Sequence, residues 1–264
     1  MDVAEPLRLS PEVSQLRLRQ LEHMVTEQRF HPPPESELVW QFFGGRKNGF
    51  FLDVGANEPQ KGSQTWMLEE RGWRGILIEP QARLCERLRQ ARPRSQVFQL
   101  ACGAPGAPPE MLLHTAESLG HSGLVKHLVD ATTTYVGTEM VKVMTLDAVL
   151  AEAGYPTIDF MTMDVEGTQF DVLRGFSLQR HRPKLLLMED HLYDLQAHRH
   201  LVRADYRLAR RTGLNNWYVP SESSFRPAGF SERFRLWKKV WANTPFRKIR
   251  VSFERRKAQQ KFID

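Results

Sequence analysis

From residue 49 onward, short apolar runs alternate with segments of helical periodicity, and this alternation constrains the fold more than any other feature of the chain. Each run has the length of a buried strand, and the intervals are long enough for crossover helices. Such βα repeats are typical of a doubly wound α/β fold, an open and mostly parallel sheet with helices on both faces. The expected strands span residues 50–54, 75–78, 96–100, 141–144, 158–163 and 185–188, followed by an antiparallel hairpin of 206–210 and 217–219.

The pattern divides the 264-residue chain into three parts. Residues 1–48 are a helical preface, whose first helix ends at a proline run and whose second ends at Gly44-Gly45. Residues 49–225 form the predicted catalytic domain, in which the poorly patterned segment 104–140 could be a lid over an acceptor. Residues 226–264 form a basic tail with 12 Lys or Arg and 3 Asp or Glu.

The tail has two interpretations. Its aromatic residues recur at helical spacing, with basic residues between them: Phe230, Phe234, Trp237 and Trp241. A helix of this kind binds an anionic membrane surface through its apolar face, or it packs on the body of the protein or on a partner subunit. Both interpretations stay open. Nucleic acid is not expected as a partner, because no binding motif accompanies the charge.

The chain is expected to be cytoplasmic, with at most a peripheral contact at the inner face of a membrane. It begins without the apolar segment of a secretory signal. Its two cysteines, Cys85 and Cys102, have neither the number nor the spacing of a disulfide framework or a zinc site, and we expect two reduced, buried thiols.

Acidic side chains follow most of the predicted strands. Asp53 ends the first strand, Glu79 follows the second, and Asp164 and Glu189 follow two later ones. In an open α/β sheet, ligands bind outside the carboxyl ends of the strands, where the strand order reverses. Several carboxylates at one edge repel each other unless a positive group binds there. The sequence therefore predicts a site at this edge that favours a cation.

The turn after the first strand distinguishes two classes of ligand. Glu79 follows Gly55 at the distance at which an acid accepts hydrogen bonds from ribose hydroxyls. A dinucleotide also needs the G-x-G-x-x-G turn for its pyrophosphate, but here a single glycine is followed by Glu58 and Pro59. This disfavours an NAD(P)-dependent oxidoreductase, which stays the alternative. S-adenosylmethionine fits better, because it combines an adenosine with a sulfonium cation and has no phosphate.

Three segments of the chain resemble the FkbM family of class I methyltransferases: FFLDVGANEPQKGSQTWMLEERGWRGILIEP, TLDAVLAEAGYPTIDFMTMDVEGTQFDVLRGF and LLLMEDH. The resemblance covers roughly residues 38–220. It implies a Rossmann-like, seven-stranded methyltransferase sheet, S-adenosylmethionine as donor, and O-methylation of a saccharide or another natural-product or small-molecule hydroxyl. The predicted cofactor contacts are Asp53, Gly55, Ala56, Asn57, Ser63, Glu79, Pro80, Ala101, Cys102, Asp164, Val165 and Glu166.

The predicted catalytic residues are Asp164, His191 and Glu189. Methyl transfer to a neutral hydroxyl needs a base; Asp164 ends a strand beside the first one, and His191 titrates near neutral pH. Glu189 could orient either of them. A divalent metal ion held by Asp164, Glu189 and Asp190, which would acidify the hydroxyl, is the alternative. Another alternative is a non-catalytic methyltransferase-fold module tethered by its basic tail, which the intact acidic edge disfavours.

Overall fold

The computed structural model describes residues 34–116, 122–124, 135–154, 157–189, 195–226 and Phe234. The first helix of the preface, the catalytic candidate His191 and nearly all of the basic tail lie outside these residues. The predictions made for them stay predictions. Within the described residues, no helix is long and apolar enough to cross a membrane.

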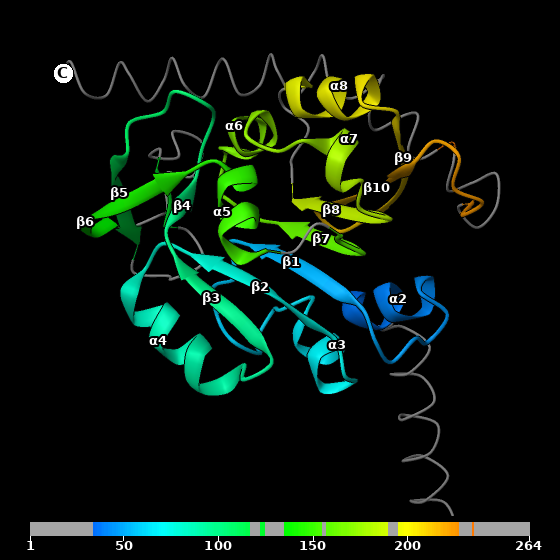
Figure 1. Cartoon of the computed structure of the whole chain (residues 1–264), viewed down its shortest axis with the longest axis horizontal. Helices are drawn as coiled ribbons and strands as arrows, with labels where there is room; N and C mark the ends of the chain where they lie inside the picture. The colour runs from blue at the N-terminus through cyan, green and yellow to red at the C-terminus, as the bar shows by residue number, and fades with distance from the viewer. Residues whose placement is uncertain are drawn as a thin grey trace, which may run out of the picture.

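A seven-stranded sheet forms the centre of the molecule, with the strand order β3-β2-β1-β7-β8-β10-β9. The first five strands in this order are parallel to one another, and β10 is antiparallel to both β8 and β9. This confirms the predicted doubly wound, mostly parallel fold and its closing hairpin (Figure 1). The strands are β1 (Phe50–Val54), β2 (Arg74–Glu79), β3 (Ser95–Gln99), β7 (Phe160–Met163), β8 (Leu185–Glu189), β9 (Tyr206–Thr212) and β10 (Asn215–Pro220).

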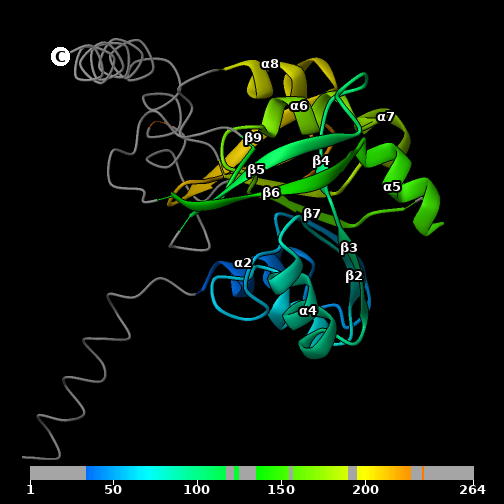
Figure 2. The same cartoon turned by 90° about the vertical axis from the view of Figure 1, so that its left-hand side faces the viewer.

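Helices cover both faces of this sheet because the central strands are apolar on both sides. In β1, Leu52 and Val54 face one core, whereas Phe51 faces the other. Figure 2 shows α4 and α5 on opposite sides of the sheet. The first core is covered by α5 (Leu146–Ala153), α6 (Gln169–Arg174), α7 (Leu178–His181) and α8 (Gln196–Arg203). The second is covered by α2 (Glu35–Phe42), α3 (Trp66–Glu70) and α4 (Ala82–Ala91).

A second, three-stranded sheet lies beyond one end of the large sheet, at the left of Figure 1. Its order is β4-β6-β5, with β4 (Ala101–Cys102), β5 (Glu110–Ala116) and β6 (Tyr135–Met144). The strand expected at 141–144 is therefore longer and pairs in this second sheet. Residues 110–116 form a strand in a segment where no strand was expected. Both strands bury alternate apolar side chains, among them Leu113, Val141 and Val143, in a small core of their own.

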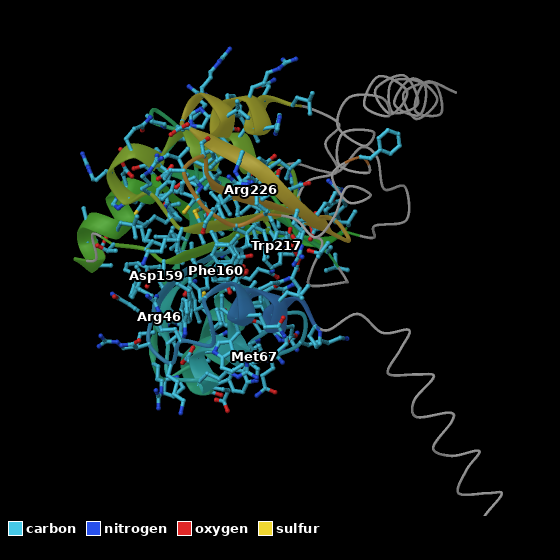
Figure 3. All side chains as sticks on the ribbon, turned by 90° about the vertical axis from the view of Figure 1, so that its right-hand side faces the viewer. Arg46, Met67, Asp159, Phe160, Trp217 and Arg226 are labelled. Atoms are coloured by element: carbon cyan, nitrogen blue, oxygen red, sulfur yellow. The ribbon has the colours of Figure 1, made fainter. Side chains whose placement is uncertain are left out.

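The amino ends of the parallel strands are fixed by a separate polar cluster. Asp159 precedes β7, and its carboxylate accepts hydrogen bonds from Lys184 Nζ at 2.8 Å and from the Phe50 backbone N–H at 3.0 Å. Arg46 pairs with the same carboxylate at 2.6 Å, and Figure 3 shows Arg46 and Asp159 next to Phe160 of β7. This cluster joins β1, β7 and β8 at the end of the sheet where no ligand site is expected, so its role is structural.

Candidate functional site

A pocket that opens to solvent lies at the carboxyl ends of β1, β2 and β7. This is the end of an open α/β sheet at which ligands bind. The large sheet provides one wall, and β5 with the segment 122–124 provides the other. The lining residues are Val54, Gly55, Asn57, Ile78, Glu79, Pro80, Gln81, Leu100, Ala101, Cys102, Leu113, Ser122, Gly123, Leu124, Asp164, Val165, Glu166 and Thr168.

Gly55 makes the turn by which the chain leaves β1 and enters the pocket. Its φ is +84°, and a Cβ at this position would lie 1.8 Å from the backbone oxygen of Asp164. The turn is tied to β2, because the N–H groups of Gly55 and Ala56 both donate to the Ile78 carbonyl, at 2.9 and 3.0 Å. Only glycine combines this backbone conformation with so close an approach of two chains.

Asn57 follows in the same loop with a φ of +51°. Its backbone N–H donates a hydrogen bond to Glu79 Oε2 at 3.0 Å. Its side-chain Oδ1 is buried and has no hydrogen-bond partner among the described residues. A buried acceptor without a partner costs free energy, and a donor group on a ligand in the pocket would relieve that cost.

Glu79 ends β2 with a carboxylate that is only 3% exposed. It accepts hydrogen bonds from the backbone N–H groups of Asn57 and Gln81, both at 3.0 Å. Burial nevertheless raises the pKa of Glu79 to about 7, against the opposing effect of these hydrogen bonds. A carboxylate held in this way has lone pairs left to accept hydrogen bonds from ligand hydroxyls.

Asp164 follows β7 and faces the carboxyl group of Glu189, at the end of β8. Partial loss of solvation, the negative charges of Glu189 and Glu166, and a hydrogen bond with Glu189 together raise the pKa of Asp164 well above its ordinary value, although the residue keeps an exposed surface. Two neighbouring carboxyl groups disfavour each other's ionisation, which is why the charge of Glu189 raises the pKa of Asp164. A carboxylate with a raised pKa is a stronger base than an ordinary aspartate.

Three predicted cofactor contacts lie outside the described lining of the pocket: Asp53, Ala56 and Ser63. The Asp53 carboxylate accepts a hydrogen bond from Thr65 Oγ1 at 2.6 Å. Ala56 is buried in the apolar core that α2, α3 and α4 cover. The hydroxyl of Ser63 accepts a hydrogen bond from the Trp66 N–H at 3.1 Å and so begins α3. Asp53 differs from Glu79 in its depth, because it pairs with Leu77 and so lies two residues before Glu79 along the sheet.

The other predicted contacts come together in the pocket. They are Gly55, Asn57, Glu79, Pro80, Ala101, Cys102, Asp164, Val165 and Glu166. Of the predicted catalytic residues, Glu189 lies behind Asp164 rather than in the described lining, and His191 is outside the described residues. Among the described residues, no group of three or more His, Cys, Asp or Glu side chains is arranged to hold a metal ion.

Several lining residues were not predicted from the sequence. Gln81 follows Glu79-Pro80, and both its backbone N–H and its side chain donate to the Glu79 carboxylate. Leu113 and Gly123 come from the second wall, where a bridge between His114 and Gly123 holds the segment 122–124 beside β5. The sequence signal for Gln81 was its position after a strand-ending acid. Leu113 gave no signal, because it reaches the pocket only through tertiary packing.

The lining of the pocket is acidic. Glu79, Asp164 and Glu166 belong to it, and among the described lining residues none is a Lys, Arg or His. Carboxylates in a partly buried site favour a cationic ligand and disfavour a phosphate. The pocket therefore suits a ligand with hydroxyl donors and a positive charge.

The mostly parallel seven-stranded sheet with its flanking helices is that of the class I methyltransferase fold. A family model described as the methyltransferase FkbM domain matches residues 53–208, which is more than half of the chain. The chain belongs to the FkbM methyltransferase family. No curated protein matches its sequence significantly.

Solved structures with a similar fold include a methyltransferase FkbM from Methylobacillus flagellatus KT, with a TM-score of 0.46 and 18% identity over 70% of this chain and 48% of that one. The chain thus spans about half the length of that protein. A TehB-like SAM-dependent methyltransferase from Corynebacterium glutamicum has a TM-score of 0.39 and 9% identity, covering 80% of this chain and 99% of that one. A methyltransferase from Geobacter sulfurreducens has a TM-score of 0.39 and 16% identity, with coverages of 80% and 90%.

Proposed function

We propose that the chain is an S-adenosylmethionine-dependent methyltransferase that methylates a hydroxyl oxygen. The observation that favours this donor is the acidic lining of the pocket, with three carboxylates and no basic side chain among the described lining residues. S-adenosylmethionine has a sulfonium and an ammonium group, which such a lining attracts. The pyrophosphate of a dinucleotide would be repelled, and the single-glycine turn offers it no cradle of backbone amides.

The residues present fit the donor molecule at both of its ends. Glu79 would accept hydrogen bonds from the ribose hydroxyls, since its carboxylate is held by the Asn57 and Gln81 amides. The unpartnered Oδ1 of Asn57 would accept a hydrogen bond from the ammonium group. Ala101 and Cys102, which are buried and apolar, would flank the adenine. Bound there, S-adenosylmethionine supplies a methyl group already activated by its sulfonium.

We propose that Asp164 is the base that accepts the proton of the acceptor hydroxyl. As the acceptor oxygen forms its bond to the methyl carbon, the carbon–sulfur bond breaks and its electron pair stays on sulfur, and the hydroxyl proton passes to the Asp164 carboxylate. The raised pKa of Asp164, caused by partial loss of solvation and by repulsion from Glu189, suits it to this role. His191, as the alternative base, and a metal ion held by Asp164, Glu189 and Asp190 remain competing proposals for the same step.

The acceptor we propose is a saccharide or another natural-product hydroxyl. The base that we propose, Asp164, favours an oxygen acceptor over an amine. A neutral hydroxyl must lose its proton to react, whereas a neutral amine is already nucleophilic. The second wall of the pocket combines the apolar side chains of Leu113 and Leu124 with the polar Ser122. It could admit a small acceptor of mixed polarity, in keeping with the family resemblance.

Titration calorimetry with S-adenosylhomocysteine and NAD⁺ tests this proposal. We expect saturable binding of S-adenosylhomocysteine and no binding of NAD⁺ at the same concentrations. Glu79→Ala should weaken the binding of S-adenosylhomocysteine by about 1.5–3 kcal/mol, the typical loss for charge-assisted hydrogen bonds. Binding of NAD⁺ instead, or an affinity unaffected by Glu79→Ala, would contradict the proposed site.

A further inference from the structure

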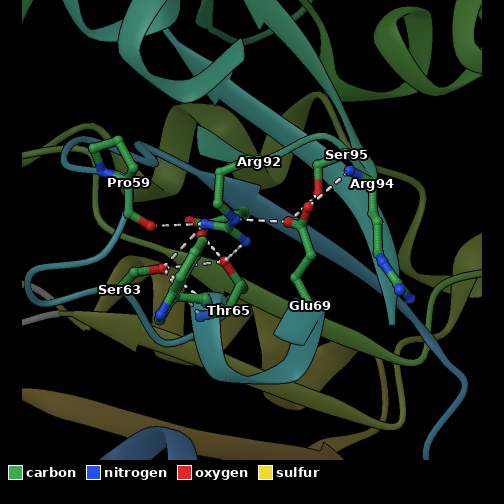
Figure 4. Close-up of polar contacts among 9 residues, drawn as sticks. Pro59, Ser63, Thr65, Glu69, Arg92, Arg94 and Ser95 are labelled. Carbon is green, nitrogen blue, oxygen red and sulfur yellow. Dashed lines mark hydrogen bonds and ion pairs between the residues drawn. The ribbon is translucent and has the colours of Figure 1, made fainter. Parts of the chain in front are cut away.

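Arg92 is a fully buried cation outside the described lining of the pocket. It lies in the turn between α4 and β3 and is 1% exposed. Its Nε donates to Glu69 Oε2 of α3 at 2.6 Å, and its guanidinium lies 5.6 Å from the ring centres of Phe51 and Trp66. Figure 4 shows it at the centre of a network of polar contacts. A buried charge needs such partners, because removing it from water is costly.

The remaining donors of Arg92 hold the loop that joins β1 to α3, residues 55–65. Nη1 donates to the Pro59 carbonyl at 3.1 Å and contacts Ser63 Oγ at 3.4 Å. Nη2 donates to Thr65 Oγ1 at 2.9 Å, and Thr65 in turn donates to Asp53 of β1 at 2.6 Å. One side chain therefore fixes the middle of the loop, its end and the strand from which it starts.

The same loop contains Asn57, two residues before Pro59. Asn57 lines the pocket, presents its buried Oδ1 and donates its N–H to Glu79. Pro59 is anchored to Arg92, so a displacement of Pro59 would shift Asn57 directly. We infer that Arg92 is a positioning residue that holds the 55–65 loop so that Asn57 can receive the amino-acid end of the donor. This inference rests on the proposed function.

The geometry requires arginine rather than any cation. The acceptors of Arg92 lie in three directions, at Glu69, at Pro59 and at Thr65. The planar guanidinium provides five donors in a fixed fork, whereas a lysine ammonium is a point charge at the end of a flexible chain. Arg92→Lys would keep the charge beside Glu69 but would lose the hydrogen bonds to Pro59 and Thr65 of the loop.

A second ion pair reaches the same loop at the surface and provides a matched control. Arg87 Nη1 of α4 pairs with Glu58 Oε1 at 2.5 Å, and the Arg87 side chain is 45% exposed. Solvent-exposed ion pairs contribute little to the stability of the folded state. Arg87→Gln removes a contact to the residue between Asn57 and Pro59 and should leave the loop in place.

The test uses Arg92→Lys and the double variant Arg92→Met/Glu69→Gln, with Arg87→Gln as control. The double variant removes both buried charges, and so avoids the unpaired Glu69 that could prevent folding. Hydrogen exchange followed by mass spectrometry measures the order of residues 55–65 without a ligand. Calorimetry then compares S-adenosylhomocysteine with adenosine, which lacks the amino-acid end.

In both Arg92 variants we expect faster exchange confined to residues 55–65. S-adenosylhomocysteine should bind at least about tenfold more weakly, because small displacements of positioning groups have large effects. The affinity for adenosine should change by less than about threefold. Arg87→Gln should match the wild type in all three measurements. Unchanged exchange in the loop, or an equal loss for the two ligands, would overturn the inference.

The two proposals fail in different ways. If the wild-type chain binds neither S-adenosylhomocysteine nor adenosine, the proposed function is wrong. Hydrogen exchange in the Arg92 variants then still decides whether Arg92 holds the loop. If the wild type binds S-adenosylhomocysteine and both Arg92 variants bind it equally well, the proposed function stands and the role assigned to Arg92 is wrong.

Discussion

Glu79 and Asp164 are both pocket carboxylates with a raised pKa, yet their surroundings differ, because Glu79 is buried and Asp164 keeps an exposed surface. Glu79 accepts two backbone N–H groups and keeps a fixed orientation. Asp164 faces other acids, and their charges add to the effect of partial loss of solvation on its pKa. The first environment suits binding, because it orients the acceptor atoms, and the second suits proton transfer, because it makes the carboxylate more basic.

The raised pKa of Glu79 predicts a pH-dependent affinity. With a pKa of about 7, most Glu79 is neutral at pH 6 and ionised at pH 8. Ribose hydroxyls donate to the ionised form, so the affinity for S-adenosylhomocysteine should rise by about tenfold between these values and level off above them. Calorimetry across this range checks the prediction. Glu79→Gln keeps the shape without titrating, and an identical pH profile in this variant would show that another group is responsible.

Asp164→Asn should separate binding from chemistry. The amide keeps the size of the side chain but accepts no proton at neutral pH. We expect the affinity for S-adenosylhomocysteine to stay within about tenfold of the wild type and turnover to fall by at least about 100-fold. Single-turnover methyl transfer to an identified acceptor measures the second quantity. Turnover at the wild-type level would remove Asp164 from the mechanism and favour His191.

At the scale of elements, the fold depends on how closely β1 and β7 approach at the pocket. The turn at Gly55 passes the end of β7 with no room for a side chain, and its amides are tied to β2. Three neighbouring strands therefore meet at one point, and this meeting point places Asn57, Glu79 and Asp164 around a common space.

Gly55 and Gly62 provide a matched pair of alanine substitutions. Both have positive φ, +84° and +77°, but a Cβ at Gly62 would meet nothing within 4 Å, whereas one at Gly55 would meet Asp164 at 1.8 Å. The backbone strain is shared, so the difference isolates the close approach. Gly55→Ala should lower the free energy of unfolding by at least about 2 kcal/mol more than Gly62→Ala, as overpacking does. Urea titration measures both, and equal losses would contradict the packing described.

The strands of the large sheet could be predicted because their apolar character is local. Leu185 to Met188, for example, form a run buried on both faces, and such a run is visible in the sequence. The strand β5 was missed because it buries only some of its residues and leaves Leu112 44% exposed. Helix α8 was missed because only Ala197 and Leu201 of its eight residues are buried, and this pattern is too sparse to identify.

The residues of the site also divide into those that the local sequence predicts and those that it does not. Residues placed directly after a strand, such as Glu79 and Asp164, could be predicted to share one edge because parallel strands end together. Asp53 was assigned to the cofactor site, but it lies outside the described lining and its carboxylate accepts a hydrogen bond from Thr65. Leu113 could not be predicted, because it reaches the pocket only when the second sheet folds over the first. The role of Arg92 depends on contacts 23 to 33 residues away in sequence.

On the scale of the whole molecule, the two ends of the large sheet differ in how their charged groups are paired. The amino ends are held by the paired charges of Arg46, Asp159 and Lys184. The carboxyl ends gather acids with raised pKa values at Glu79 and Asp164, where the opposing charge has to come from a ligand.

The crystal structure of the chain with S-adenosylhomocysteine tests the central proposal most directly. We expect the ligand between the two sheets, with its ribose hydroxyls donating to Glu79, its ammonium group at Asn57 Oδ1 and its sulfur facing Asp164. A ligand bound elsewhere, a ribose that does not contact Glu79, or an empty pocket at saturating ligand concentration would contradict it.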